Sequence, residues 1–230
     1  MAKPYLTEEC FQNFLNLFQD STFSEDEKEL LSRNRTEVFF KKNELIIKQG
    51  SLANQLVFIQ KGITKSYFEY GNTKQTICMH PPKSLLGIQA LAEANVYHCN
   101  LSALEEVSTC MFDLKTIKNI ALQNASFVFQ LLNIIIEHQS VNIDRIFSLK
   151  LKSSNAKIAD VLLCLSQRVY KSDTFDFNFT IEDIANLTGV PADTASGIWK
   201  NFQTEGIIQL EPGKLIILDK EKLLFISSLL

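Results

Sequence analysis

The chain has 230 residues, of which 46% are hydrophobic and 21% are charged, with 8 glycines and 5 prolines. This composition is typical of a folded globular protein and excludes collagen-like, low-complexity and disordered chains. The formal net charge is −3, so no general positive field indicates a polyanionic partner, and any binding to nucleic acid must be local. The length allows one large domain or two modest ones, at about 150 residues per domain.

Three features predict a soluble cytoplasmic protein with no membrane partner. Glu8 and Glu9 precede the first apolar run, which is unlike a secretory signal peptide. The longest apolar stretch, residues 127–136, is interrupted by Gln130 and Asn133 and is shorter than the roughly 18–20 residues of a membrane helix. The 5 cysteines are odd in number and form no CxxC pair, which favours reduced thiols.

The first half of the chain predicts two helices followed by short strands. Phe11, Phe14 and Phe18 have helical spacing, and Ser24 with Glu27 forms the pattern of a capping box that begins a second helix. Short β-branched and aromatic runs, separated by turn signals, follow at residues 38–40, 44–48, 56–60, 64–70, 76–79, 100–104 and 108–112. This spacing is typical of a small antiparallel barrel or roll.

Helical spacing returns after residue 113 and predicts a short helix over residues 116–123 and a long one over 125–151. The long helix has a stripe with a spacing near 3.5 residues, formed by Val128, Leu132, Ile135, Gln139, Asn142, Ile146 and Leu149. A helix with three consecutive isoleucines needs burial on more than one side, and a second copy in a symmetric dimer supplies the other side most simply. The alternative is an ordinary core helix within one chain.

The last part of the chain predicts a winged helix-turn-helix. Residues 153–155 interrupt the helical pattern and cap a helix to residue 170, so we divide the chain into domains at 1–124, 125–151 and 152–230. Thr180 and Asp183 fit a capping box, and Gly189 and Pro191 separate that short helix from the next one. Residues 207–210 and 215–218 then predict a hairpin, and residues 219–230 a last helix. The fold class is therefore α+β.

These motifs, in this order, resemble the Crp/Fnr family of bacterial transcription regulators. Residues 179–207 resemble its DNA-binding domain, and residues 40–50 and 56–62 resemble its cyclic-nucleotide-binding roll, a double-stranded β-helix. The resemblance covers about residues 25–220. It implies a homodimer with an effector-binding roll, a long dimerisation helix and a winged domain that inserts one helix into the major groove of double-stranded DNA. It also leaves open a contact with RNA polymerase and a small-molecule effector.

The expected effector pocket departs from the members that bind cyclic AMP. Those members hold the ribose with a Gly-Glu-Leu step and the phosphate with an Arg-Ser pair, whereas here residues 85–89 read LLGIQ and the later pair is His98-Cys99. Without an arginine there is no bidentate phosphate partner, so we expect no cyclic AMP binding. The pocket holds a less anionic ligand or is filled by side chains. Its candidate residues are Gly87, Ile88, Gln89, Tyr97, His98, Cys99 and Asn100.

No metal or other cofactor is expected. Iron–sulfur members of the family carry several cysteines near the N-terminus, where this chain has only Cys10. Cys78-Met79-His80 is superficially similar to the Cys-Met-His of the carbon-monoxide-sensing haem member, but here it precedes the turn at residues 81–84 and lies on a predicted strand. A core or surface role for these residues is favoured over haem ligation.

The predicted recognition helix also departs from the family pattern, Arg-Glu-Thr-x-x-Arg, because residues 192–197 read ADTASG. Both arginines are lost, and residues 151–230 contain 8 basic and 10 acidic residues. We therefore expect weak or A·T-leaning recognition, with backbone N–H groups at the start of the preceding helix available to phosphate. The candidate DNA contacts are Thr180, Ile181, Ala192, Asp193, Thr194, Ser196, Gly197, Lys200 and Lys214, with Lys152 and Lys157 as further phosphate partners.

An enzyme is not expected, because the chain has no HExxH, GxxxxGK[ST] or GxGxxG motif and no Ser/His/Asp order. His80, His98 and His138 are too few and too scattered for a catalytic site. Two functions therefore compete. The first is a dimeric DNA-binding transcription regulator that does not respond to cyclic AMP. The alternative is a DNA-independent ligand- or protein-binding module on the same scaffold, which the missing arginines and the acidic domain favour.

Overall fold

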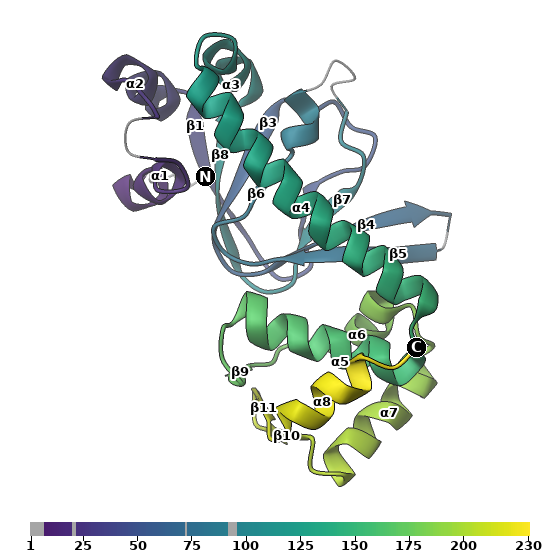
Figure 1. The fold of residues 1–230 in the computed structure, drawn as a ribbon. Coiled ribbons are helices and arrows are strands. Elements are labelled where there is room, and N and C mark those ends of the chain that lie inside the picture. Colours follow the sequence, from purple (N-terminus) through teal and green to yellow (C-terminus); the bar gives the residue numbers. More distant parts are fainter. Residues whose placement is uncertain (1–6, 20–21, 72, 92–95) are drawn as a thin grey trace. The chain divides into compact units, whose positions relative to one another are not determined.

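The computed structural model describes residues 7–19, 22–71, 73–91 and 96–230 (Figure 1). The chain forms two compact units, one made of Met1–Ser66 with Met79–Ser140 and the other of Tyr67–Cys78 with Val141–Leu230. The expected domain limits at residues 124 and 151 remain a prediction about which segments fold independently.

The predicted antiparallel roll is confirmed. One four-stranded sheet has the order β1 (Arg35–Phe40), β8 (Val107–Asp113), β3 (Gln55–Lys61) and β6 (Leu85–Leu86), and its pairs are antiparallel. The other has the order β2 (Leu45–Ile47), β7 (Asn100–Ala103), β4 (Thr64–Tyr70) and β5 (Thr73–His80) (Figure 1). Sequence spacing missed β6 and the 3₁₀ turn η1 (Ile88–Leu91), because each is too short to show a period.

Two N-terminal helices close one side of the roll. In α1 (Glu8–Leu15) the side chain of Thr7 caps the N-terminus, and α2 (Glu25–Arg33) begins with the predicted Ser24 capping box. The apolar face of α1 is buried, and the Phe14 ring lies 4.0 Å from the Phe112 ring of β8, centroid to centroid. An aromatic core follows from this packing, formed by Phe11, Phe14, Phe18, Phe23, Phe58, Phe112 and Phe127.

The interior of the roll is a second core. Its buried members are aliphatic or thioether side chains from both sheets: Ile47, Val57, Ile59, Leu86, Leu101, Ala103, Val107 and Met111. Each fully buried side chain of this size stabilises the fold by about 1.5–3 kcal/mol relative to an exposed one. Much of the space inside the roll is therefore filled by the chain itself.

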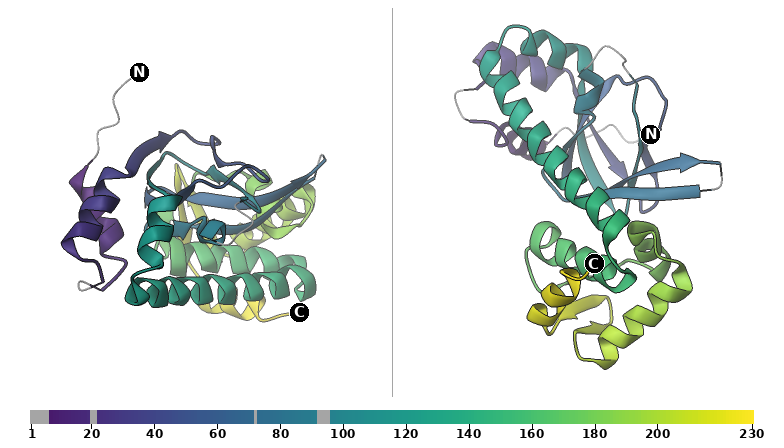
Figure 2. Two further views of the ribbon diagram at one scale, coloured as in Figure 1. Left: turned by 90° about the horizontal axis from the view of Figure 1, so that it is seen from above. Right: turned by 45° about the vertical axis from the view of Figure 1, so that its right-hand side comes forward.

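Helices α3 (Leu114–Ala121) and α4 (Ala125–Leu151) follow the roll, and the bounds of α4 agree with the predicted 125–151. Asp113 caps α3, and the Asn124 side chain accepts a 2.9 Å hydrogen bond from the Phe127 N–H at the start of α4. Figure 2 shows α4 as one unbroken helix. Among the described helices none alone has the length and apolarity to cross a membrane, and α3 with α4 meets that test only as a pair bent by 116°.

The second unit contains the predicted winged helix-turn-helix. Its helices are α5 (Ser154–Cys164), which continues into a π-helical turn η2 (Leu165–Val169), α6 (Ile181–Thr188), α7 (Ala192–Thr204) and α8 (Lys220–Ser227). Strands β10 (Ile208–Glu211) and β11 (Lys214–Ile217) form the wing, and β9 (Thr174–Asp176) adds a third strand that the sequence did not predict. Helix α8 packs on α5 (Figure 1).

Candidate functional site

The turn between α6 and α7 has the geometry that its sequence predicts. Thr180 Oγ1 accepts a 3.1 Å hydrogen bond from the Asp183 N–H, which completes the capping box of α6. Gly189 ends the helix at φ +66°, a left-handed conformation that side chains disfavour, and its N–H donates to the Ala185 carbonyl at 2.8 Å. Pro191 then precedes α7, so the two helices are fixed by local backbone chemistry.

Helix α7 buries one face and exposes the other. Ala195, Ile198, Trp199 and Phe202 are buried, and the Trp199 ring stacks on Phe177 at 5.2 Å. The opposite face is polar or small, and it is formed by Ala192, Asp193, Thr194, Gly197, Lys200 and Asn201. The structure therefore exposes five of the six predicted contact residues of this helix, while Ser196 is half-buried.

Asn201 was missed by the sequence analysis, although the signal was present. Asp193, Gly197 and Asn201 are spaced four residues apart and therefore lie on one helix face. A Cβ added at Gly197 would meet no other atom within 4 Å, so the middle of this face is open. An asparagine beside open space can hydrogen-bond the edge of an adenine.

The basic residues of this unit divide into free and paired groups. Lys200 and Lys214 are exposed, and no carboxylate in the described part of the chain pairs with either one. Lys152 Nζ instead lies 2.8 Å from Asp160 Oδ1, and its side chain is only 20% exposed. The prediction of Lys152 as a phosphate contact is therefore not supported, because its charge is neutralised within the fold.

The predicted phosphate site at the start of α6 is also weakened. The Thr180 N–H donates to Asp183 Oδ2 at 3.0 Å, so this donor is already used. The Asp183 carboxylate also places a negative charge where phosphate was expected. The capping box that begins the helix therefore competes with an anion for the same N-terminus.

The outer face of α4 is apolar and exposed. Its large side chains recur with heptad spacing and are 48–66% exposed: Phe129, Leu132, Ile136, Ile143 and Ile146. Val128, Ile135 and Asn142 of the predicted stripe are half-buried instead, and Ile135 packs against the aromatic core. At three positions the exposed residue is therefore the one that follows the predicted residue. Helix α4 has two apolar faces, and the sequence alone does not show which of them the roll covers.

A groove accompanies this face at the start of α4. It has a volume of about 410 Å³ and is lined by Leu122, Val128, Phe129 and Leu132, with Ala121, Gln123 and Ala125. Leu122 is 84% exposed, so the groove continues the apolar surface beyond the helix end.

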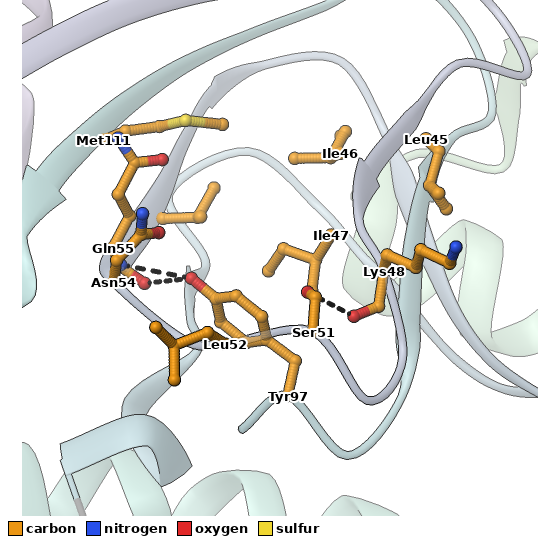
Figure 3. A pocket seen from close by; sticks show the side chains of 11 residues that line it. Leu45, Ile46, Ile47, Lys48, Ser51, Leu52, Asn54, Gln55, Tyr97 and Met111 are labelled. Carbon is orange, nitrogen blue, oxygen red and sulfur yellow. Dashed lines mark hydrogen bonds between the residues drawn. The ribbon is translucent and has the colours of Figure 1, made fainter. Parts of the chain in front are cut away.

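The roll has a cavity of about 280 Å³, and the Tyr97 side chain is one of those that line it (Figure 3). The Tyr97 hydroxyl donates to the Gln55 carbonyl at 2.7 Å and accepts from the Gln55 N–H at 3.2 Å. Burial raises the pKa of this hydroxyl, so it remains a neutral donor. Polar groups of Lys48, Ser51 and Asn54 line the rest with aliphatic side chains (Figure 3).

The structure brings only part of the predicted pocket to this cavity. Tyr97 lines it, and Gly87 lies beside it, because a Cβ added there would be 3.4 Å from the Tyr97 ring and 3.2 Å from the Gln55 carbonyl. Ile88 is buried in the aromatic core instead. Gln89 and His98 are exposed, and Cys99 is half-buried with a pKa that burial raises. Ile88, at the position where members that bind cyclic AMP hold the ribose, is therefore a core residue.

One further predicted residue, Asn100, lies outside the cavity, whereas several residues that line it were not predicted. Asn100 is buried, but its side chain accepts a 2.9 Å hydrogen bond from the Gln49 N–H and is not part of the lining. The loop residues that do line the cavity are Lys48, Ser51, Leu52, Asn54 and Gln55. Leu52 also forms an antiparallel bridge with Val96. No sequence period marks such a loop.

Some titratable residues that seemed scattered in sequence lie together. The rings of His80 and His138 are 6.4 Å apart, centroid to centroid. Cys10, Glu37 and Cys110 are buried, and their ligand atoms all lie within 4.8 Å of one another. The Arg35 guanidinium is 3.1 Å from Glu37, so its positive charge opposes a cation at that position.

Comparison with known protein families gives two matches in chain order. Residues 37–124 match the cyclic nucleotide-binding domain, and residues 156–226 match the Crp-like helix-turn-helix domain. Together these two matches cover more than half of the chain.

Curated relatives are similar over most of their length. The transcriptional activator protein FnrA of Stutzerimonas stutzeri is 23% identical over 184 residues, covering 78% of this chain and 75% of the relative. The transcriptional activator protein anr of Pseudomonas aeruginosa is 24% identical over 200 residues, covering 85% and 80%.

Solved structures share the fold. FixK2 from Bradyrhizobium japonicum superposes with a TM-score of 0.78 at 17% identity, covering 85% of this chain and 98% of that one. A putative transcriptional regulator of the crp/fnr family from Eubacterium rectale gives 0.75 at 19% identity, covering 92% and 99%.

Proposed function

Because this chain belongs to the Crp/Fnr family of transcription regulators and has both of its domains, we propose that it acts as a cytoplasmic homodimer that binds double-stranded DNA through α7 in the major groove. The observation that carries the proposal is the exposed polar face of α7 next to a buried aromatic one. Relatives named as transcriptional activators support it. Because these relatives are named as activators, the proposal includes a contact with RNA polymerase.

The chemistry of α7 defines which bases it reads. Asp193 offers an acceptor, which suits the amino group of cytosine, and Asn201 suits adenine. Lys200 and the wing residue Lys214 supply charge to phosphates. With so few cations the affinity is weak, and the Thr180 and Ile181 N–H groups add little, because Asp183 occupies the N-terminus of α6.

The exposed face of α4 supports the dimer. Phe129, Leu132, Ile136, Ile143 and Ile146 occupy the a and d positions of a heptad pattern, with the exposed Gln139 at the position between Ile136 and Ile143. A two-fold axis would pair this face with its own copy and cover apolar surface that water otherwise contacts. Of the predicted stripe, Leu132 and Ile146 belong to this seam.

The cavity in the roll favours the proposal that the effector is a ligand other than cyclic AMP. Its cavity is smaller than most small-molecule sites, and its interior is filled by aliphatic side chains. Among the described residues that line the cavity none is an arginine, and Lys48 is the single cation. A small, largely apolar ligand fits this chemistry best.

The DNA-independent binding module is not favoured, because the matched domains and the named relatives both indicate a regulator. The family consists of transcription regulators and is not defined by a catalytic activity. Removing a positive charge from α7 and measuring DNA binding distinguishes the regulator from the DNA-independent module.

The test is equilibrium binding of the full chain to a pool of short genomic DNA fragments at low salt. Replacement of Lys200 by alanine should weaken binding about threefold to tenfold, because it removes a phosphate contact from each subunit. Lys115→Ala is the matched control, since Lys115 is an exposed lysine on α3. Equal affinities of the two variants would contradict a role for α7 in DNA binding.

A further inference from the structure

Two buried cysteines face each other where α1 packs on the roll. Cys10 lies in the first turn of α1, and Cys110 lies in the middle of β8, opposite Glu37 of β1. Their side chains are almost completely buried, and the two sulfur atoms lie within 4.8 Å of each other. The remaining cysteines, Cys78, Cys99 and Cys164, are each half-buried elsewhere.

The surroundings of the pair are asymmetric. Arg35 Nη1 lies 4.0 Å from Cys110 Sγ and also contacts the Glu37 carboxylate at 3.1 Å and the Thr7 carbonyl at 3.0 Å. Glu37 in turn accepts a 2.6 Å hydrogen bond from the Thr7 N–H at the start of α1. A guanidinium so close to Cys110 stabilises a negative charge on its sulfur.

The pKa values of the two thiols shift in opposite directions, because one hydrogen bond joins Cys10 and Cys110. A hydrogen bond from Cys10 and the nearby Arg35 lower the pKa of Cys110, and they outweigh the opposite effects of burial and of the Glu37 carboxylate. That hydrogen bond, together with burial, raises the pKa of Cys10. Cys110 is therefore the nucleophile of the pair, and Cys10 keeps its proton until it is needed.

We propose that Cys10 and Cys110 form a peroxide-reactive dithiol, which oxidation converts into a disulfide that joins α1 to β8. A metal ion is the weaker alternative. Glu37 already accepts hydrogen bonds from Thr7 and Arg35, and the Arg35 charge repels a cation.

The reaction balances with hydrogen peroxide as the oxidant. The Cys110 thiolate attacks one peroxide oxygen, the O–O bond breaks, and the departing hydroxide takes a proton to become water, which leaves Cys110 as a sulfenic acid. The Cys10 sulfur then loses its proton and attacks the Cys110 sulfur, and the displaced hydroxide leaves as a second water. Two thiols lose two electrons, and one peroxide is reduced to two waters.

The disulfide requires a movement of α1. A sulfur–sulfur bond is about 2.05 Å long, so the sulfurs must approach each other from their present separation. Helix α1 has 8 residues and is held at its start by Thr7, and local opening of this helix also admits peroxide to the buried sulfurs. Phe11 and Phe14 of α1 share the aromatic core with Phe127 of α4, so the movement reaches the start of α4.

The test uses the reduced full chain treated with a small molar excess of hydrogen peroxide, alkylated, digested and examined by mass spectrometry. We expect a peptide pair linked through Cys10 and Cys110, a loss of about 2 Da from the intact protein, and reversal by dithiothreitol. In Cys10→Ser the reaction should stop at the Cys110 sulfenic acid, which dimedone traps. Cys99→Ser is the control and should still form the linked pair.

Three results would overturn the proposal. The first is oxidation of Cys78, Cys99 or Cys164 before the buried pair. The second is a Cys110 sulfenic or sulfinic acid in the unsubstituted chain with no linked peptide. The third is equimolar zinc in the purified protein that is lost in Cys10→Ser, which would assign the pair to a metal. Peptide mapping of the unsubstituted chain decides the first two even if a variant fails to fold.

Discussion

The main-chain N–H of Thr180 donates a 3.0 Å hydrogen bond to the carboxylate of Asp183, one turn into α6. The same carboxylate accepts a 2.9 Å hydrogen bond from the Thr180 hydroxyl. This arrangement begins the helix, but it also places a negative charge at the end of α6 that a DNA phosphate would otherwise approach. The Asp183 carboxylate therefore stabilises the helix but disfavours the approach of a DNA phosphate.

Asp183→Asn should raise affinity for DNA. An asparagine keeps an acceptor for the Thr180 N–H but removes one negative charge from each subunit, so we expect binding about twofold to fivefold tighter, which is about 0.4–1 kcal/mol. Fluorescence anisotropy with a labelled duplex at fixed salt measures the change. Glu221→Gln, an exposed charge change on α8, is the control. An equal gain in both variants would show that only net charge matters.

Ile136→Asp should yield a folded monomer. Ile136 is 61% exposed on the outer face of α4, so a carboxylate there is solvated in the monomer and buried only in a dimer seam. Light scattering at micromolar concentration measures the mass. Glu137→Gln alters the charge at the neighbouring exposed position and should remain dimeric.

Ile135→Asp should behave differently from Ile136→Asp. Ile135 packs against the aromatic core, so the buried carboxylate should destabilise the fold itself by several kcal/mol. Urea unfolding separates this loss from dissociation. A stable monomer from Ile135→Asp, or a dimeric Ile136→Asp, would contradict the assignment of the two faces.

Cyclic AMP should produce no binding heat in titration calorimetry. Ile88 replaces the carboxylate that would hold the ribose and is buried in the core, and no arginine lines the cavity to pair with the phosphate. Each missing charge-assisted hydrogen bond is worth about 1.5–3 kcal/mol. A family member with the Gly-Glu-Leu and Arg-Ser motifs is the positive control. Micromolar binding by this chain would refute the argument.

Asp173 should stabilise the winged domain at neutral pH and not in acid. A hydrogen bond from Lys220 at 2.7 Å, and another from Ser166, lower the pKa of Asp173. A lowered pKa in the folded state stabilises the protein above the unfolded pKa of about 4, and this stabilisation disappears as the pH falls through the folded value.

Asp173→Asn measures this effect. Asp173 is 44% exposed, so the loss at pH 7 should be small, about 0.2–1 kcal/mol, and it should be smaller near pH 2. Denaturant unfolding at both pH values gives the difference. Asp176→Asn, at an exposed acid on β9, should show little change at either pH.

The sequence predicted the elements that local chemistry determines. The capping boxes at Ser24 and Thr180, the Gly189 turn and the wing follow from the nearest few residues, and all are present. The limits of α4 also agree, because residue 124 caps its start and an apolar period continues to its end.

The parts that were missed depend on tertiary packing. Which apolar face of α4 the roll covers depends on the aromatic core, so Ile135 of the predicted outer stripe packs against that core and Ile136 is exposed instead. The cavity is lined in part by a loop that forms the Leu52–Val96 bridge. Lys152 pairs with Asp160, eight residues away on the next helix. These contacts join different elements of the fold, and no periodic pattern in the sequence indicates them.

We expect α7 of a dimer to read DNA, and the decisive measurement is a binding selection of the full chain on fragmented genomic DNA. We predict enrichment of one two-fold symmetric sequence with half-sites one helical turn apart. We also predict a shallow salt slope for that sequence, on the order of −3 to −5, because each subunit offers few unpaired cations. Enrichment of no sequence, with or without cell extract to supply an effector, would contradict the regulator and leave the DNA-independent module.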